Sequence, residues 1–121
     1  YCVEHHFSGL KRLLRDDGKS AQIRTAIDTN NIEAAPLENR QKTAMEYARQ
    51  LTRDPGGMRE DIVKKLRTAG YSDGEILEIN QVCAYFSYAN RTVLGLGCTT
   101  NGDILGLSPN KNDDPDDWNH T

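Results

Sequence analysis

The longest helical pattern in this chain spans residues 72–97 and reads SDGEILEINQVCAYFSYANRTVLGLG. Ser72 and Glu75 have the spacing of a capping box, and Gly95 and Gly97 are suited to end a helix. Apolar residues recur between them every three or four positions, as on one face of a helix: Ile76, Ile79, Val82, Cys83, Phe86, Ala89 and Val93. The pattern predicts one long helix, and we expect it to be the central core helix.

Shorter segments with helical spacing precede this one, and turn-forming residues separate them. They cover residues 2–16, 20–29, 37–51 and 58–69. Gly18 follows the first segment and is expected to end it. No segment alternates in the manner of a strand, and no internal repeat is evident. The sequence therefore predicts an all-α helical bundle.

The composition changes after Cys98 to Asn, Asp, Pro and Gly. This change divides the chain into one helical domain, residues 1–98, and an irregular C-terminal tail, residues 99–121. Trp118 is the exception in the tail, because a lone tryptophan among polar residues is typical of a docking point. We expect it to dock on the body of the domain or on a neighbouring subunit.

Composition excludes several classes of function. The 121 residues fit one domain, and 15 Lys and Arg against 18 Asp and Glu give a net charge of -3, which does not favour nucleic acid as a partner. No apolar run approaches the roughly 20 residues that cross a membrane, and no secretory signal is evident. Three cysteines at irregular spacing argue against a disulfide framework. We expect a soluble, cytoplasmic protein that does not bind membranes.

Cys2 and His6 are the residues best suited to carry chemistry. They stand four positions apart, which places a thiol and an imidazole on the same side of a helix. A helix amino end and a neighbouring imidazole can both favour the reactive thiolate. His5, three residues from Cys2, is a possible auxiliary group in the same role.

Other interpretations of these residues stay open. Cys2 can be an ordinary small buried residue, and the two histidines ordinary helix residues of which one faces the core, since this spacing alone is a weak signal. A zinc site of Cys2, His5 and His6 lacks a fourth ligand, so we expect no metal and no cofactor. Cys83 lies on an apolar stripe and is interpreted as packing, and nothing near Cys98 in sequence would activate its thiol.

Several separated motifs resemble one family in the right order. Residues 1–6, YCVEHH, look like the second half of the Cys-x-x-Cys-x-x-x-His signature of alkylhydroperoxidase D-like (AhpD-like) proteins, within the carboxymuconolactone decarboxylase-like fold. The chain is similar to the peroxidase-related branch of this family over nearly its whole length, in the segments 66–73, 76–79, 84–86, 90–97 and 118–120.

The resemblance implies an AhpD-like helical bundle that assembles as a homo-oligomer and reduces hydroperoxides without a cofactor. On the family's pattern Cys2 is the cysteine that attacks the peroxide and His6 helps to deprotonate it. An external dithiol then restores the thiol. The family's first cysteine and its relay glutamate would lie before Tyr1, which itself stands where well-known members have another histidine. We therefore expect the sequence to begin inside the motif.

Two different functions remain as alternatives. The chain can be a non-catalytic helical oligomeric module that keeps the fold without a complete cysteine pair. It can also be a carboxymuconolactone decarboxylase-like enzyme, in which His6 is an acid–base group and Cys2 is incidental.

Overall fold

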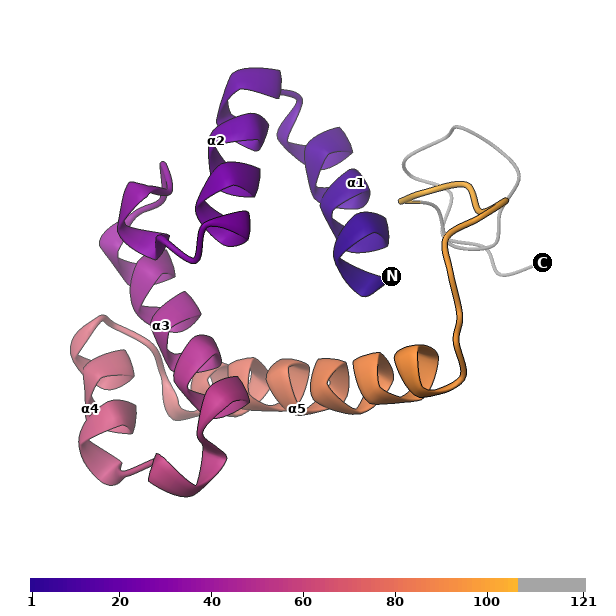
Figure 1. Ribbon diagram of the computed structural model, residues 1–121. Coiled ribbons are helices and arrows are strands. Elements are labelled where there is room, and N and C mark those ends of the chain that lie inside the picture. The colour runs from indigo at the N-terminus through magenta and orange to yellow at the C-terminus, as the bar shows by residue number, and fades with distance from the viewer. Residues whose placement is uncertain (107–121) are drawn as a thin grey trace.

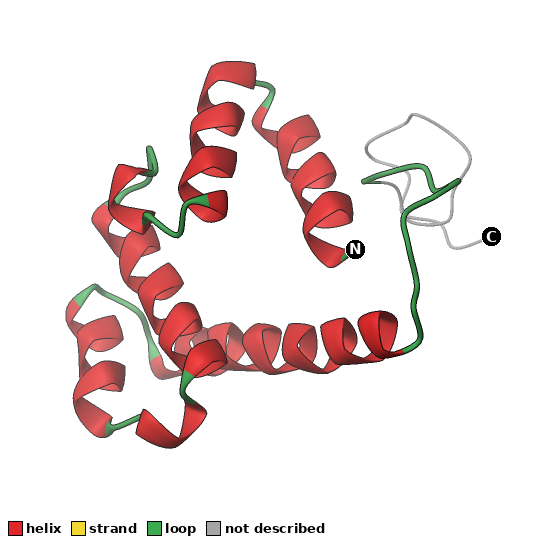
Figure 2. Cartoon of the chain, in the orientation of Figure 1, coloured by secondary structure: helices red, strands yellow, loops and turns green. Residues whose placement is uncertain are grey.

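The structure is a computed structural model that describes residues 1–106, and these residues contain helices and turns but no strand (Figure 2). The prediction of an all-α fold is therefore confirmed for this part of the chain. The helices are α1 (Cys2–Leu14), α2 (Asp17–Asp28), α3 (Asn39–Arg53), α4 (Glu60–Thr68) and α5 (Asp73–Gly95). Two single 3-10 turns, η1 (Ile32–Ala34) and η2 (Pro55–Gly57), flank α3.

The five helices form two groups that meet along α5. Helices α3 and α4 pack on each other and on the amino-terminal half of α5, while α1 and α2 form an antiparallel pair (Figure 1). The amino end of α1 points toward the carboxyl-terminal half of α5, and the chain after α5 turns back toward α1 (Figure 1). This route brings both ends of the described chain to one side of the molecule.

The first helix ends earlier than predicted, and Gly18 does not end it. Helix α1 stops at Leu14, because Arg15 adopts a left-handed conformation with φ of 50°. Asp16 then begins α2 as its N-cap and accepts a 2.8 Å hydrogen bond from the Lys19 amide. Gly18 consequently lies in the first turn of α2. The capping aspartate, a strong helix-start signal, sets this boundary.

The capping box predicted at the start of α5 is confirmed. The Glu75 amide donates to Ser72 Oγ over 3.3 Å, and the Ser72 amide donates to Glu75 Oε2 over 2.8 Å. The hydrogen bond from the Ser72 backbone and a further one from Arg40 lower the pKa of Glu75 to about 2. The helix therefore begins at a carboxylate that stays ionised over almost the whole pH range.

The hydrophobic core lies where α3, α4 and α5 meet. Tyr47, Leu66 and Ile76 contribute one buried side chain from each of these helices, and Leu66 is fully buried. The Tyr47 hydroxyl is satisfied by a 2.9 Å hydrogen bond from Asn80 Nδ2. A second set of buried side chains lies around α2 and η1: Ser20, Ile23, Ala26, Ile32 and Ala35.

Helix α5 is not a central core helix along its whole length, so that prediction is wrong. Within the described residues, Ile76 is the one buried residue of α5, and Val82 and Leu94 are 56% and 62% exposed. The reason is geometric: α3 and α4 cover only the first part of a helix of 23 residues. The apolar spacing is helical as predicted, but within residues 1–106 the second part of α5 is contacted only by the amino end of α1, through His6 and Phe86.

Residues 99–106 contain turns and no helix. The predicted docking residue Trp118 lies outside the described residues. None of the helices in the described part of the chain is long and apolar enough to cross a membrane.

Candidate functional site

Cys2 is the first residue of α1 and has a free, half-buried thiol. No side chain caps this end of the helix, so the amide groups of the first turn keep their partial positive charge. A thiolate is stabilised by such a helix end. The predicted nucleophile therefore occupies a position that suits a reactive cysteine.

His6 lies one helical turn after Cys2, but its ring packs against another helix. The imidazole meets the Phe86 ring of α5 edge to face, with 4.7 Å between centroids and 82° between planes. This contact connects α1 to α5. Among the hydrogen bonds of residues 1–106, none joins the Cys2 sulfur to His5 or His6.

His5 has a charged partner that the sequence did not indicate. Its Nε2 lies 3.1 Å from Oδ2 of Asp103, and its side chain is 19% exposed. Because an ionised carboxylate can only accept, Nε2 must carry the hydrogen. The Tyr1 ring packs on the same imidazole at 4.8 Å between centroids. An acid–imidazole pair thus stands at the amino end of α1.

The phenol of Tyr1 lies near several ionisable groups at the amino end of α1. The negative charge of Asp103 raises the pKa of the Tyr1 phenol, with smaller contributions from burial and from hydrogen bonding to the same carboxylate. The thiolates of Cys98 and Cys2 raise this pKa further. Both sulfurs are therefore within electrostatic range of one phenol, although 96 positions of sequence separate them.

Asp103 is held beside α1 by a close contact of backbones. Gly106 has a φ of 77°, and a Cβ atom on it would stand 2.7 Å from the Gly9 amide nitrogen and 2.8 Å from the Ser8 carbonyl carbon. A side chain at this position would have to push the segment away from the helix. The glycine therefore lets residues 103–106 lie directly against α1.

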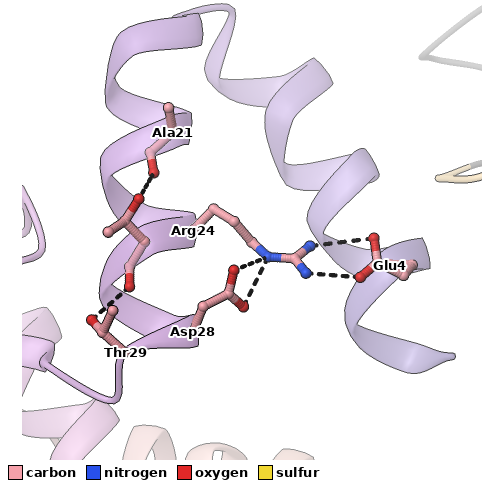
Figure 3. A network of polar contacts seen from close by, with 6 residues as sticks. Glu4, Ala21, Arg24, Asp28 and Thr29 are labelled. Carbon is pink, nitrogen blue, oxygen red and sulfur yellow. Dashed lines mark hydrogen bonds and ion pairs between the residues drawn. The ribbon is translucent and has the colours of Figure 1, made fainter.

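A second polar network fixes α1 on α2. Arg24 of α2 donates to Glu4 of α1 over 2.8 Å and to Asp28 over 2.8 Å (Figure 3). Hydrogen bonds from this guanidinium lower the pKa of Glu4. Arg24 also lies over the Phe7 ring, 5.3 Å from its centroid. These contacts set the orientation of the helix that carries Cys2, His5 and His6.

The other two cysteines lie in different surroundings. Burial raises the pKa of the Cys83 thiol, and a hydrogen bond with Thr52 opposes this only in part, so its thiolate is the less available form. Cys98 is exposed just after α5. No group of three or more metal-ligating side chains occurs in residues 1–106, so the zinc interpretation gains no ligand from the fold.

A hollow of about 350 Å³ lies on α2 and η1, and none of the candidate residues contributes to it. Its lining consists of Ala21, Gln22, Thr25, Ala26, Thr29, Asn31 and Ala34. The candidate site is therefore a cluster at the surface end of α1 and is separate from this hollow.

The chain matches no protein-family model, and the comparisons with curated proteins and with solved structures found no significant match. The resemblance stated from the sequence therefore rests on its motifs alone. What the fold adds to it is an all-helical small domain.

Proposed function

We propose that this protein is a thiol-dependent, peroxidase-type oxidoreductase of the AhpD-like kind, in which Cys2 reduces a hydroperoxide. The observation that carries the proposal is the position of a free, half-buried thiol on the first turn of α1 with two imidazoles one turn along the helix. The helix end favours the thiolate, and an imidazole can move the proton.

The chemistry requires one thiol and one external reductant. The Cys2 thiolate attacks the terminal peroxide oxygen, the O–O bond breaks, and the released alkoxide takes a proton to become an alcohol. The sulfur is now a sulfenic acid. A thiol of an external dithiol condenses with it, releasing water and forming a mixed disulfide, and the second thiol of the dithiol then displaces Cys2 as a thiol.

The test is peroxide consumption with dithiothreitol and either cumene hydroperoxide or hydrogen peroxide. Cys2→Ser should abolish turnover, because an alcohol cannot form a sulfenic acid. Cys83→Ser and Cys98→Ser are matched controls that each remove one thiol elsewhere, and they should keep most of the activity. Turnover that survives Cys2→Ser would contradict the proposal.

A non-catalytic helical oligomeric module is the second candidate, because apolar side chains are unusually exposed. On α5 and its C-cap, Leu77, Val82, Tyr85, Tyr88, Leu94 and Leu96 are between 56% and 78% exposed. Each of these side chains exposes on the order of 100 Å² of apolar surface, so the six together expose several hundred Å². A standard interface buries about 800 Å² per partner, and its apolar part is of comparable size. Homo-oligomer formation is thus proposed for both functions.

The two candidates differ in what happens to the thiol. An assembly module needs no reactive cysteine, so it predicts that no peroxide is consumed and that Cys2→Ser leaves the oligomer unchanged. The peroxidase proposal predicts rapid loss of peroxide and a sulfenic acid on Cys2 that dimedone traps.

A further inference from the structure

The two imidazoles beside Cys2 stand in different surroundings. The His6 ring packs on an apolar partner, Phe86. The Nε2 of His5 is joined to the carboxylate of Asp103. We infer that His5, positioned by Asp103, is the imidazole that takes the proton from Cys2; this inference rests on the proposed thiol chemistry.

The spacing on α1 puts His5 within reach of the thiol. Residues three apart on a helix are neighbours, with about 5–6 Å between their Cβ atoms. Cys2 and His5 have this spacing, and both are partly buried at the same end of α1. No hydrogen bond joins the Cys2 sulfur to His5 in residues 1–106, so the proton would pass through one bridging water.

Asp103 decides which nitrogen of His5 is available. Since the carboxylate accepts from Nε2–H, the neutral ring keeps its lone pair on Nδ1, and this nitrogen is left to accept the proton. After the transfer, the carboxylate faces an imidazolium and stabilises it. Asp103 is therefore a positioning residue, which acts on the thiol only through His5.

The proton balance of the peroxide step follows from this arrangement. Cys2 gives its proton to Nδ1 of His5 and attacks as the thiolate. When the O–O bond breaks, His5 returns the proton to the leaving alkoxide, which departs as an alcohol. The ring ends the step neutral, with its Nε2–H still donated to Asp103.

Two contacts hold the pair in place before any substrate binds. The Tyr1 ring packs on the His5 ring, with 4.8 Å between centroids. The close approach of Gly106 to Gly9 keeps the segment that carries Asp103 against α1. The first contact restricts the orientation of the imidazole, and the second keeps the carboxylate that sets its tautomer in place.

The test measures alkylation of Cys2 by iodoacetamide in a Cys83→Ser, Cys98→Ser background, so that one thiol reacts. His5→Gln and Asp103→Asn should each slow alkylation at neutral pH by about tenfold, a modest part of the 10²–10⁴-fold that a positioned base contributes. Asp103→Glu should restore much of the rate. His6→Gln tests the competing base that the family pattern implies, and if His5 is the base this variant should slow alkylation by less than about twofold.

A second readout reports the tautomer itself. Long-range ¹H–¹⁵N correlation spectra should show His5 of the unaltered protein with its hydrogen on Nε2, and Asp103→Asn should give a mixture of tautomers. Gly106→Ala should have the same effect by displacing the segment. Gly95→Ala is its control, because Gly95 lies at the end of α5, has open space around its Cβ position and does not have a left-handed φ.

The outcomes separate this inference from the proposed function. If His6→Gln slows alkylation while His5→Gln and Asp103→Asn do not, the inference is overturned and the peroxidase proposal stands. The inference is equally overturned if Asp103→Asn leaves the His5 tautomer unchanged. If both readouts respond as expected but no peroxide is consumed, the pair is upheld and the peroxidase proposal fails.

Discussion

Two regions of the helical domain have the same apolar spacing but differ in how far their apolar side chains are buried. Where α3, α4 and the start of α5 meet, Tyr47, Leu66 and Ile76 are buried together. Helix α1 has a comparable apolar stripe but no buried residue, and the second half of α5 exposes Tyr85 and Tyr88. Apolar periodicity thus identifies the face of a helix that seeks cover, and the packing of other helices decides whether that face is covered.

The buried cluster and the candidate site lie in different regions of the molecule. The buried cluster of Tyr47, Leu66 and Ile76 contributes hydrophobic stabilisation, because burial of apolar area is its source. The candidate site lies at the open end, where ion pairs and aromatic contacts hold α1: Glu4 to Arg24, His5 to Asp103 and His6 to Phe86. Such contacts individually contribute little, so this end can change without unfolding the domain.

The largest expected effect is on the packed end. Leu66→Ala removes a fully buried side chain and should lower the free energy of unfolding by about 2–5 kcal/mol. Leu13→Ala is the matched control on α1, where the side chain is 67% exposed, and it should change stability by less than about 0.5 kcal/mol. Urea denaturation followed by circular dichroism measures both. Equal losses would mean that the two ends are packed alike.

The next effect concerns the exposed face of α5. The double variant Tyr85→Ser, Tyr88→Ser removes two aromatic side chains that are 61% and 68% exposed. Sedimentation should show that the unaltered protein is an oligomer and that this variant has at most about half its mass, because aromatic side chains dominate interface energies. Lys65→Ser, an exposed position on α4, is the control and should assemble normally. If the double variant has the same mass as the unaltered protein, this face of α5 is not part of the interface between subunits.

The smallest expected effect is a local response of α1 to acid. The pKa of Glu4 in the folded chain is lowered, first by the hydrogen bonds from Arg24, so the ionised carboxylate favours the docked helix. That contribution is fully present above the ordinary value of 4.5 and is lost as the pH falls through the lowered pKa. The amide signals of Phe7 and Gly9 should therefore shift together in this acid range, while the core signals stay constant.

Arg24→Gln provides the comparison for this titration. Without the guanidinium, the Glu4 carboxylate should titrate at its ordinary value, so the midpoint of the amide shifts should move to higher pH. Identical titrations in both proteins would show that Arg24 does not hold α1 through Glu4.

The sequence was a good guide to local structure. The five helical segments and the capping box of Ser72 and Glu75 are all formed by interactions over a few residues. The prediction that Gly18 ends the first helix is wrong, because Asp16, two residues earlier, accepts the Lys19 amide hydrogen bond and starts α2. The spacing of Cys2, His5 and His6 on one helix likewise followed from local periodicity.

What the sequence by itself determined is therefore the helical character of the chain, the approximate limits of its helices and the grouping of a thiol with two imidazoles on α1. Only the tertiary structure decided that half of α5 stays uncovered, that Asp103 rather than a nearer acid meets His5, and that His6 packs on Phe86. The physical reason is that hydrogen bonds within helices, caps and turns join near neighbours in the chain, whereas Asp103 is 98 positions from His5 and no sequence pattern links them.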